Sequence, residues 1–400
     1  MNKGKNSDFE ANAPAVVIVG TGLAGYTVAR ELRKLDSTVP LVLISEDDGC
    51  FYSKPTLSNA LAMKKQASEL AVSDARTMAA QLNARVLAHS VVERIDVERH
   101  EVVVGENTLQ YRQLVLALGA DARRIPVAGD GAADILSVNN LSDYAQFRGR
   151  LREAGSVAIL GAGLIGCEFA NDLALAGYRV SLLDPAAAPL SRLVPGTVGN
   201  ALAAALGKHG VNLHLGTSVT EMTRTQQGYR LTCSNGESLS ADLVLSAIGL
   251  APRTGLAARA GIAIDNGVRT DAWCRTSAPD VFALGDCAAI DGKVQPYVLP
   301  IMHAARALAR TLSGNETRVD FPVMPVTVKT PALPAVIVTP AGEGEWRVDG
   351  VESEASGVAA AALRAVCESP PDRKLLGFAL LGQATAGKAE LIKAMAAAPV

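Results

Sequence analysis

The feature that most constrains this chain is a β-branched run at residues 16–19 that leads into Gly20, Gly22 and Gly25. The residues after it have helical spacing, so the segment predicts a strand, a tight turn and a helix. In this arrangement the first glycine makes the turn, the second lets the backbone approach a phosphate, and the third lets helix and strand pack closely. The helix N-terminus then offers unpaired N–H groups to a pyrophosphate. We therefore expect a dinucleotide site built on Gly20, Thr21, Gly22, Leu23, Ala24 and Gly25.

The next predicted strand, at residues 41–44, runs into the polar residues Ser45, Glu46 and Asp47. An acid about 20 residues past such glycines is placed to accept hydrogen bonds from the ribose hydroxyls of an adenosine. Periodicity does not choose between Glu46 and Asp47, so both are candidates for the ribose contact.

The same opening occurs a second time. Residues 156–160 form an apolar run that leads into Gly161, Gly163 and Gly166, and a further predicted strand ends at Asp184. Asp184 would accept from a free 2′-hydroxyl and repel a 2′-phosphate, which favours NADH over NADPH. Two buried runs also repeat, at residues 113–119 and 242–249, and they end in Gly119 and Gly249. The chain therefore contains two dinucleotide units.

These patterns predict an α/β protein with two Rossmann-like dinucleotide-binding domains and a small α+β C-terminal domain. We expect a flexible tail at 1–12, a discontinuous first domain at 13–120 and 242–318, a second domain at 121–241, and a third at 319–400. Residues 57–82 are expected to be mostly helical. Proline-spaced short strands are expected at 321–331, and a closing helix at 388–398.

Composition excludes several classes of function. The formal net charge of −2 gives no basic excess for nucleic acid. The six cysteines form no CxxC pair and the five histidines show no metal spacing, so we expect a reducing compartment, the cytoplasm, and no metal site. No apolar run is long enough for a membrane span.

Two nucleotide sites suggest two nucleotides whose reactive rings meet, a flavin at the first and a nicotinamide at the second. The motif order GxGxxG, LALG, GxGxxGxE, SAIG and LGDCA resembles the flavoprotein reductases of the glutathione-reductase type. That resemblance implies FAD at the first glycine set and NAD(P)H at the second. It also implies that Asp286, in the Gly-Asp motif, holds the flavin ribityl chain.

Disulfide-reducing members of that family carry a redox cysteine after the second strand. Here Lys54 stands where single-cysteine members place theirs, and Cys50 has no CxxxxC partner. A lysine cation near the isoalloxazine would stabilise electron-rich reduced flavin and hold a carboxylate, for which Glu168 is the candidate. Lys54 and Glu168 are therefore the expected catalytic pair.

The Ser-Lys-Pro loop at 53–55, the segment 166–172 and the run MPVTVKTP at 324–331 together resemble bacterial rubredoxin–NAD reductases. This resemblance implies electron flow from NADH through FAD to rubredoxin, feeding a hydroxylase in hydrocarbon degradation or an oxygen-detoxifying system. It also implies cofactor contacts at Val92, Gly119, Gly249, Val298 and Lys329, although Lys329 fits equally an edge-strand lysine that discourages aggregation.

Other functions stay open at this point. The acceptor could be a [2Fe–2S] ferredoxin or a flavorubredoxin, Cys50 could support a thiol-dependent NADH oxidase, or the chain could be a flavin-binding redox sensor. Rubredoxins are typically acidic, so a basic docking rim is expected, with Arg306, Arg310 and Lys329 as candidates. Both a monomer and a homodimer are compatible with the sequence.

Overall fold

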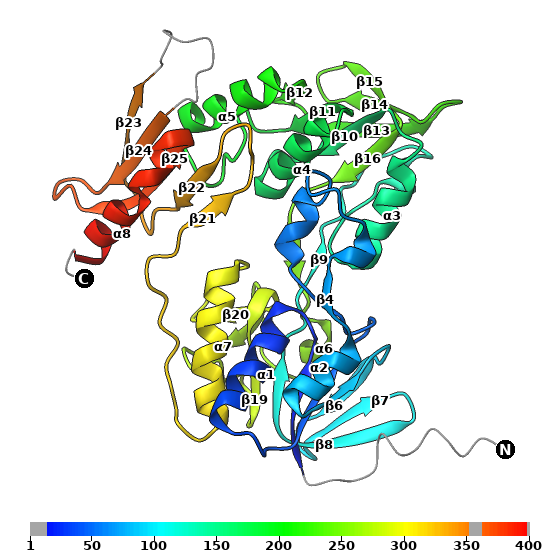
Figure 1. Ribbon diagram of the computed structural model, residues 1–400, viewed down its shortest axis with the longest axis vertical. Coiled ribbons are helices and arrows are strands. Elements are labelled where there is room, and N and C mark those ends of the chain that lie inside the picture. Colours follow the sequence, from blue (N-terminus) through cyan, green and yellow to red (C-terminus); the bar gives the residue numbers. More distant parts are fainter. Residues whose placement is uncertain (1–13, 352–361, 398–400) are drawn as a thin grey trace. The chain divides into compact units, whose positions relative to one another are not determined.

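The computed structural model describes residues 14–351 and 362–397, and the tail expected at 1–12 lies outside them. The chain forms two compact units (Figure 1). Unit 1 comprises the described parts of Met1–Ser53, Leu70–Asp121 and Leu250–Phe321. Unit 2 comprises the described parts of Lys54–Glu69, Ala122–Gly249 and Pro322–Val400.

The main sheet of unit 1 has the strand order β5-β2-β1-β8-β7-β6, with β19 also paired to β8. Strands β5, β2, β1, β8 and β19 run parallel, whereas β6 and β7 extend the sheet as an antiparallel hairpin. The strands are β1 (Ala15–Val19), β2 (Leu41–Ile44), β5 (Arg85–Leu87), β6 (Val92–Asp96), β7 (Glu101–Val104), β8 (Asn107–Leu116) and β19 (Val281–Ala283).

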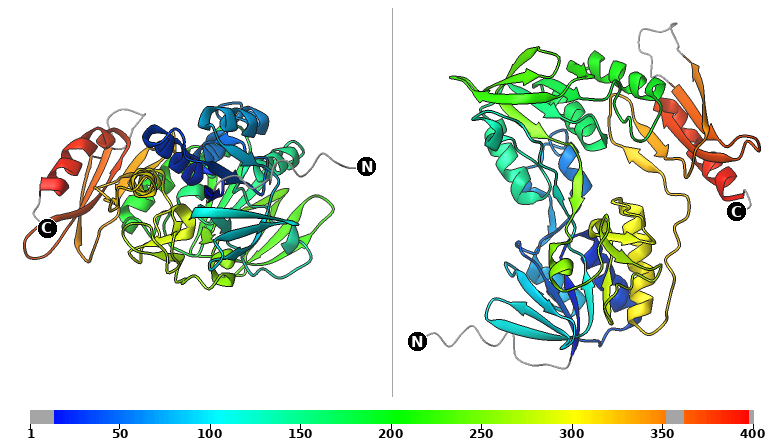
Figure 2. Two further views of the ribbon diagram at one scale, coloured as in Figure 1. Left: turned by 90° about the horizontal axis from the view of Figure 1, so that it is seen from below. Right: turned by 180° about the vertical axis from the view of Figure 1, so that it is seen from behind.

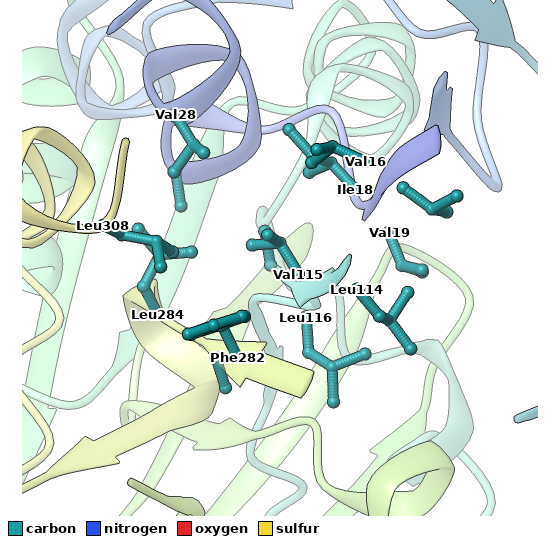
Figure 3. Close-up of a cluster of buried hydrophobic side chains, with 14 of the residues drawn as sticks. Val16, Ile18, Val19, Val28, Leu114, Val115, Leu116, Phe282, Leu284 and Leu308 are labelled. Carbon is teal, nitrogen blue, oxygen red and sulfur yellow. The ribbon is translucent and has the colours of Figure 1, made fainter. Parts of the chain in front are cut away.

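Helices α1 (Leu23–Leu35) and α7 (Val298–Leu312) pack side by side in unit 1. Figure 3 shows Val28 of α1 and Leu308 of α7 gathered with Val115 of β8 in the core. These side chains are fully buried, so the β-branched strands bury apolar area that favours folding by about 25 cal/mol per Å². The smaller elements of unit 1 are β3 (Phe51–Tyr52), β4 (Ala71–Ser73), α2 (Ala75–Leu82), β17 (Leu250–Pro252), α6 (Gly255–Arg259), β18 (Val268–Thr270) and β20 (Ala288–Ile290). Strand β9 (Ala120–Ala122) begins in unit 1 and ends on the first residue of the next segment of unit 2.

Unit 2 contains a second parallel sheet, in the order β12-β11-β10-β16, and an antiparallel sheet β13-β14-β15. Its elements up to residue 249 are α3 (Leu141–Leu151), β10 (Ser156–Leu160), α4 (Leu164–Leu175), β11 (Arg179–Asp184), α5 (Gly196–Lys208), β12 (Val211–Leu215), β13 (Val219–Arg224), β14 (Tyr229–Cys233), β15 (Ser238–Ala241) and β16 (Leu243–Ser246).

The C-terminal part of unit 2 is an antiparallel sheet in the order β21-β22-β25-β24-β23. Helix α8 lies against one face of this sheet, where Leu391 packs with Phe378 and Leu380 (Figure 2). The elements are β21 (Val326–Val328), β22 (Ala335–Val338), β23 (Glu345–Val351), β24 (Ala362–Glu368), β25 (Leu375–Leu381) and α8 (Lys388–Ala397). The predicted fold class, two Rossmann-like domains and an α+β C-terminal domain, is confirmed.

The structure differs from the sequence-based expectations in several places. Residues 57–82 are not mostly helical: the 3₁₀ segments Lys54–Asn59 and Ala67–Glu69 and strand β4 precede a short α2. Within 321–331 the structure has a strand only at β21, because the prolines there lack the N–H groups a ladder needs.

The expected domain boundaries also differ. Strand β16 pairs with β10, so residues 242–249 complete the second sheet as β8 completes the first. The segment Lys54–Glu69 belongs to unit 2 instead of the first domain, and the C-terminal part groups with the second dinucleotide domain. Side-chain hydrogen bonds to α4 explain this grouping, as the next subsection describes.

Candidate functional site

The first glycine turn has the geometry that a dinucleotide phosphate requires. Gly20 has φ +114°, and a Cβ there would lie 2.2 Å from the carbonyl oxygen of Ala117. A Cβ on Gly25 would lie 1.9 Å from the carbonyl oxygen of Gly20, so helix and strand pack too closely for a side chain. A Cβ on Gly22, by contrast, would meet no atom within 4 Å, which leaves open space beside its backbone.

The second glycine turn repeats this geometry in unit 2. Gly161 has φ +105° and a Cβ there would lie 2.7 Å from the carbonyl oxygen of Ala247. A Cβ on Gly166 would meet the carbonyl oxygen of Gly161 at 1.8 Å, while Gly163 again faces open space. Both turns therefore combine two sterically required glycines with one that leaves room for a ligand.

Both turns open into helix N-termini. Gly22 and Gly163 are the N-caps of α1 and α4, and neither helix has a side-chain cap or an acid in its first turn. The first N–H groups of each helix are thus available to an anion. The Gly-Asp motif approaches the first of these turns, because a Cβ on Gly285 would lie 2.9 Å from the Cβ of Ala24. This contact brings the backbone before Asp286 to the start of α1.

The polar residues after β2 are linked to the first glycine turn. The Ser45 hydroxyl shares a hydrogen bond with the Thr21 hydroxyl at 2.5 Å, and both residues are buried. Asp47 accepts from the Ser45 hydroxyl and from the Gly49 N–H. Glu46 instead pairs with Arg253. The two candidate ribose acids therefore lie in different surroundings.

Asp184 lies at the corresponding end of β11. Its carboxylate accepts from the N–H of Ala162, within the second glycine turn, at 2.7 Å. It also accepts from the N–H of Ala186 at 2.8 Å. These bonds hold the Asp184 carboxylate beside the second glycine turn.

Glu168 lies in a buried polar cluster of unit 2. The side chain is 2 % exposed and accepts from the Ser58 hydroxyl and, at 2.8 Å, from the backbone N–H of Lys329. The Lys329 ammonium lies 3.4 Å from Oε2 of Glu168, the oxygen that also accepts from the Ser58 hydroxyl. Glu168 is the fifth residue of α4, so it lies just beyond the first turn of that helix.

Lys329 joins the C-terminal sheet to the 3₁₀ segment Lys54–Asn59. Its ammonium donates to the carbonyl of Pro55 and, at 2.8 Å, to the side-chain oxygen of Asn59. The Asn59 amide donates in return to the Lys329 carbonyl at 3.0 Å. The Lys329 side chain therefore links the C-terminal sheet to the 3₁₀ segment. This arrangement favours neither the expected cofactor contact nor the expected edge-strand lysine that discourages aggregation.

Two further residues of α4 extend this cluster. Asp172 accepts from the N–H groups of Leu61 and Ala62 at 3.0 and 2.8 Å, and Asn171 accepts from Ala332 at 3.0 Å. Burial raises the pKa of Asp172 to about 6, although the two N–H donors act in the opposite direction. Glu168, Asn171 and Asp172 stand at i, i+3 and i+4 and share one face of α4. This spacing of polar residues in an apolar helix was the sequence signal that we missed.

The remaining predicted site residues are dispersed over both units. Lys54 begins its 3₁₀ segment in unit 2, and Val298 is the first residue of α7, 37 % exposed, in unit 1. Val92 starts β6 and is buried in the core cluster of unit 1. Gly119 and Gly249 both have positive φ, at +72° and +105°, immediately after the repeated strands.

The structure argues against Cys50 as a catalytic thiol. Burial, followed by the hydrogen bond to Asp48, raises the pKa of the Cys50 thiol to about 11. The thiol is therefore protonated at neutral pH and is a poor nucleophile. The described residues contain no group of three or more His, Cys, Asp or Glu side chains that could hold a metal ion. No helix in the described ranges is long and apolar enough to cross a membrane.

Comparison with known families decides the assignment. Residues 14–309 match the pyridine nucleotide-disulphide oxidoreductase family, and residues 318–395 match a rubredoxin binding C-terminal domain. The chain belongs to the pyridine nucleotide-disulphide oxidoreductases. Members of this family bind FAD and NAD(H), in agreement with the two glycine turns.

Individual relatives agree with the family. The chain is 45% identical over 94% of its length to a rubredoxin–NAD(+) reductase of Acinetobacter baylyi, of which it covers 96%. It is 44% identical over 96% of its length to a rubredoxin–NAD(+) reductase of Alcanivorax borkumensis, of which it covers 98%. A ferredoxin reductase structure from Rhodopseudomonas palustris has a TM-score of 0.84 and 25% identity, with 94% of this chain and 93% of that one covered.

The residues of the two glycine turns fit the two nucleotides. The first turn, with its open space at Gly22 and the free N–H groups of α1, would hold the FAD pyrophosphate. The second turn, with Gly163 and α4, would hold the pyrophosphate of NADH. When bound, FAD supplies the redox chemistry, because it takes a hydride from NADH and can release electrons singly.

Proposed function

We propose that this chain transfers electrons from NADH, through FAD, to rubredoxin. The observation that carries the proposal is the match of residues 318–395 to a rubredoxin binding domain, on a chain whose residues 14–309 belong to an FAD- and NAD-binding family. The two rubredoxin–NAD(+) reductases that it resembles at 44% and 45% identity support the same acceptor. As consumers of the electrons we propose a hydroxylase, such as an alkane monooxygenase, or an oxygen-detoxifying system.

We propose Lys54 and Glu168, both of unit 2, as the catalytic residues. Lys54 starts the same 3₁₀ segment that carries Ser58 and Asn59, and both of these bond to the Glu168–Lys329 cluster. The cluster therefore fixes the segment on which Lys54 lies. A lysine held in this way would present a cation to electron-rich reduced flavin without an active-site thiol.

We propose Asp184 as the residue that selects NADH, since its carboxylate lies against the second glycine turn. A negative charge at this position accepts from a ribose 2′-hydroxyl and repels a 2′-phosphate. We place the reaction in the cytoplasm, in keeping with six free cysteines.

The test is NADH-driven reduction of purified rubredoxin, with a [2Fe–2S] ferredoxin at equal concentration in parallel. We expect kcat/KM for rubredoxin to exceed that for ferredoxin more than about a hundredfold, roughly 2.7 kcal/mol in transition-state terms. A preference for the ferredoxin would reassign the acceptor, in line with the ferredoxin reductase of similar fold. Bleaching of the flavin by NADH with no transfer to either protein would favour a redox sensor.

A further inference from the structure

A turn at residues 62–65 of unit 2 carries an apolar side chain beside two lysines. Met63 is 48% exposed, Lys64 is exposed and Lys65 is half-buried. Within residues 14–351 and 362–397, neither of these lysines forms an ion pair with a carboxylate. The turn therefore offers an apolar contact with positive charge next to it, on a chain whose formal net charge is −2.

The backbone of this turn is held by a buried acid of α4. Asp172 is 2% exposed and accepts from the N–H groups of Leu61 and Ala62 at 3.0 and 2.8 Å. The Lys64 N–H donates to the Leu61 carbonyl at 2.8 Å and closes the turn. A surface that is fixed before binding loses less conformational entropy when a partner docks. The turn is therefore preorganised for a contact.

Lys64 adopts a backbone conformation that a lysine does not favour. Its φ is +54°, in the left-handed region that glycine and asparagine enter at lower cost. The geometry of the turn therefore does not require a lysine at this position. Lys64→Asn removes the charge and suits the backbone better, so it separates the role of the charge from the stability of the turn.

The segment that leads into the turn is bonded to the part of the chain that matches a rubredoxin binding domain. The Asn59 amide donates to the Lys329 carbonyl at 3.0 Å, and Lys329 lies within the matched residues 318–395. The turn begins three residues after Asn59, a stretch of at most about 11 Å. Even a small electron-transfer interface, with about 600 Å² per partner, is roughly 25 Å across. An interface around Lys329 is therefore wide enough to include the turn.

Lys329 itself has little charge to offer a partner. Its ammonium donates to the carbonyl of Pro55 and to the side-chain oxygen of Asn59, and it lies 3.4 Å from Oε2 of Glu168. These bonds use the ammonium inside unit 2, although Lys329 is one of the residues expected in a basic docking rim. The two lysines of the turn supply the positive charge that Lys329 does not.

We propose that the turn at residues 62–65 is part of the docking surface for rubredoxin, with Met63 as the apolar contact and Lys64 and Lys65 as the positive rim. Rubredoxins are typically acidic, so the rim attracts the partner and orients it. Methionine is enriched at the centres of protein interfaces, whereas charged side chains gather around them. The inference rests on the proposed function, because it takes rubredoxin as the acceptor.

The experiment measures reduction of a purified acidic rubredoxin by the FAD-loaded full-length chain at low and high salt. We expect Lys64→Asn combined with Lys65→Gln to lower kcat/KM for rubredoxin about tenfold at about 20 mM salt. At about 500 mM salt, where charges are screened, the loss should be less than about twofold. Met63→Ser should lower kcat/KM about threefold at both salt concentrations, because salt does not screen an apolar contact. The rate of flavin reduction by NADH, measured without rubredoxin, should stay within about twofold in every variant.

Lys208→Gln is the matched control, since Lys208 is an exposed lysine in the last turn of α5 in the same unit. At about 20 mM salt we expect kcat/KM to fall about threefold for Lys64→Asn alone and to change less than about 1.5-fold for Lys208→Gln. Equal losses in these two variants would indicate a general effect of net charge and would overturn the docking surface. A loss for Lys64→Asn that comes with a lower unfolding temperature would overturn it as well, because the fold would then be the cause.

Failure of the docking surface is distinguishable from failure of the proposed function. A wild type that reduces its flavin with NADH but reduces no rubredoxin would overturn the proposed function and the surface together. A wild type and a double lysine variant that reduce rubredoxin equally well would overturn the surface alone. Sedimentation tests the other occupant, a second copy of this chain: a wild-type dimer that the double variant dissociates would assign the turn to that contact and overturn the proposal.

Discussion

The buried carboxylate of Glu168 accepts a hydrogen bond from the backbone N–H of Lys329 at 2.8 Å, which joins α4 to the end of β21. The helix of the second glycine turn is therefore attached directly to the C-terminal sheet. Ser58 bonds to the same carboxylate, so the 3₁₀ segment that begins with Lys54 is held at the same point. Three parts of unit 2 meet at one acidic side chain.

Removal of Glu168 should destabilise unit 2. Glu168→Ala leaves the Ser58 hydroxyl and the backbone N–H of Lys329 without the carboxylate that accepts from them, and it removes the ion-pair partner of the Lys329 ammonium. We expect the free energy of unfolding to fall by about 3 kcal/mol. Glu168→Gln retains one acceptor oxygen and should cost about 1 kcal/mol. Urea unfolding measures both values, with the exposed Glu237→Ala of the same unit as control. Equal stability of all three variants would contradict the role of the cluster.

The two kinds of glycine in the first turn should respond differently to alanine. Gly22 has an ordinary φ of −70° and open space around it, so Gly22→Ala should fold normally but lose at least about tenfold in FAD affinity. Gly25→Ala would place a Cβ 1.9 Å from a carbonyl oxygen and should destabilise the apoprotein itself. Apoprotein unfolding and FAD titration separate the two effects. Normal FAD affinity of Gly22→Ala would show that the phosphate lies elsewhere.

Cys50 should be dispensable for electron transfer. Because its thiol pKa is raised to about 11, Cys50→Ser should leave kcat for rubredoxin within about twofold of the wild type at about pH 7.5. Steady-state assays with rubredoxin and with oxygen as acceptors provide the measurement. A large loss in either assay would revive the thiol-dependent oxidase.

Asp184 should control coenzyme choice. The wild type should prefer NADH to NADPH by about a hundredfold in kcat/KM, and Asp184→Ala should reduce that preference at least tenfold by weakening NADH. Because the carboxylate also accepts from Ala162 and Ala186, the unfolding temperature of this variant is recorded beside its kinetics. An unchanged preference in a folded variant would remove Asp184 from the ribose site.

The buried Asp172 should make stability fall as pH rises. Its pKa is raised to about 6 in the folded chain from an ordinary value of 3.8, so the folded state binds the proton more tightly than the unfolded state. The contribution of Asp172 to the free energy of unfolding is fully present below about pH 4. It is lost as pH rises through 6, by up to roughly 3 kcal/mol. Urea unfolding of wild type and Asp172→Asn between about pH 4.5 and 7.5 isolates it. A stability difference between the two that does not change with pH would refute the assignment.

The fold could be predicted from sequence where local chemistry decides it. The glycines at 20, 22 and 25, and again at 161, 163 and 166, act through backbone contacts close to their own turns, so their pattern specified both turns. The membership of residues 54–69 in unit 2 depends instead on Asp172 and Glu168, more than 100 positions away. The periodicity of a sequence carries no information about hydrogen bonds between such distant residues. The sequence pattern likewise gave no sign of Arg253, whose side-chain partners Asp121 and Glu46 are 132 and 207 positions away.

Helix α4 carries two duties within a few turns, because its N-terminus forms the second glycine turn while Glu168, Asn171 and Asp172 anchor distant segments. Substitutions along this helix would disturb nucleotide binding and anchoring together. An engineer who wants a different coenzyme should therefore leave α4 intact and vary side chains at the end of β11, where the Asp184 carboxylate bonds to the N–H groups of Ala162 and Ala186. The backbone there is held separately, because the N–H groups of Thr217 and Gly216 donate to the carbonyls of Asp184 and Ala186, so a side chain can be exchanged on a backbone that other bonds keep in place.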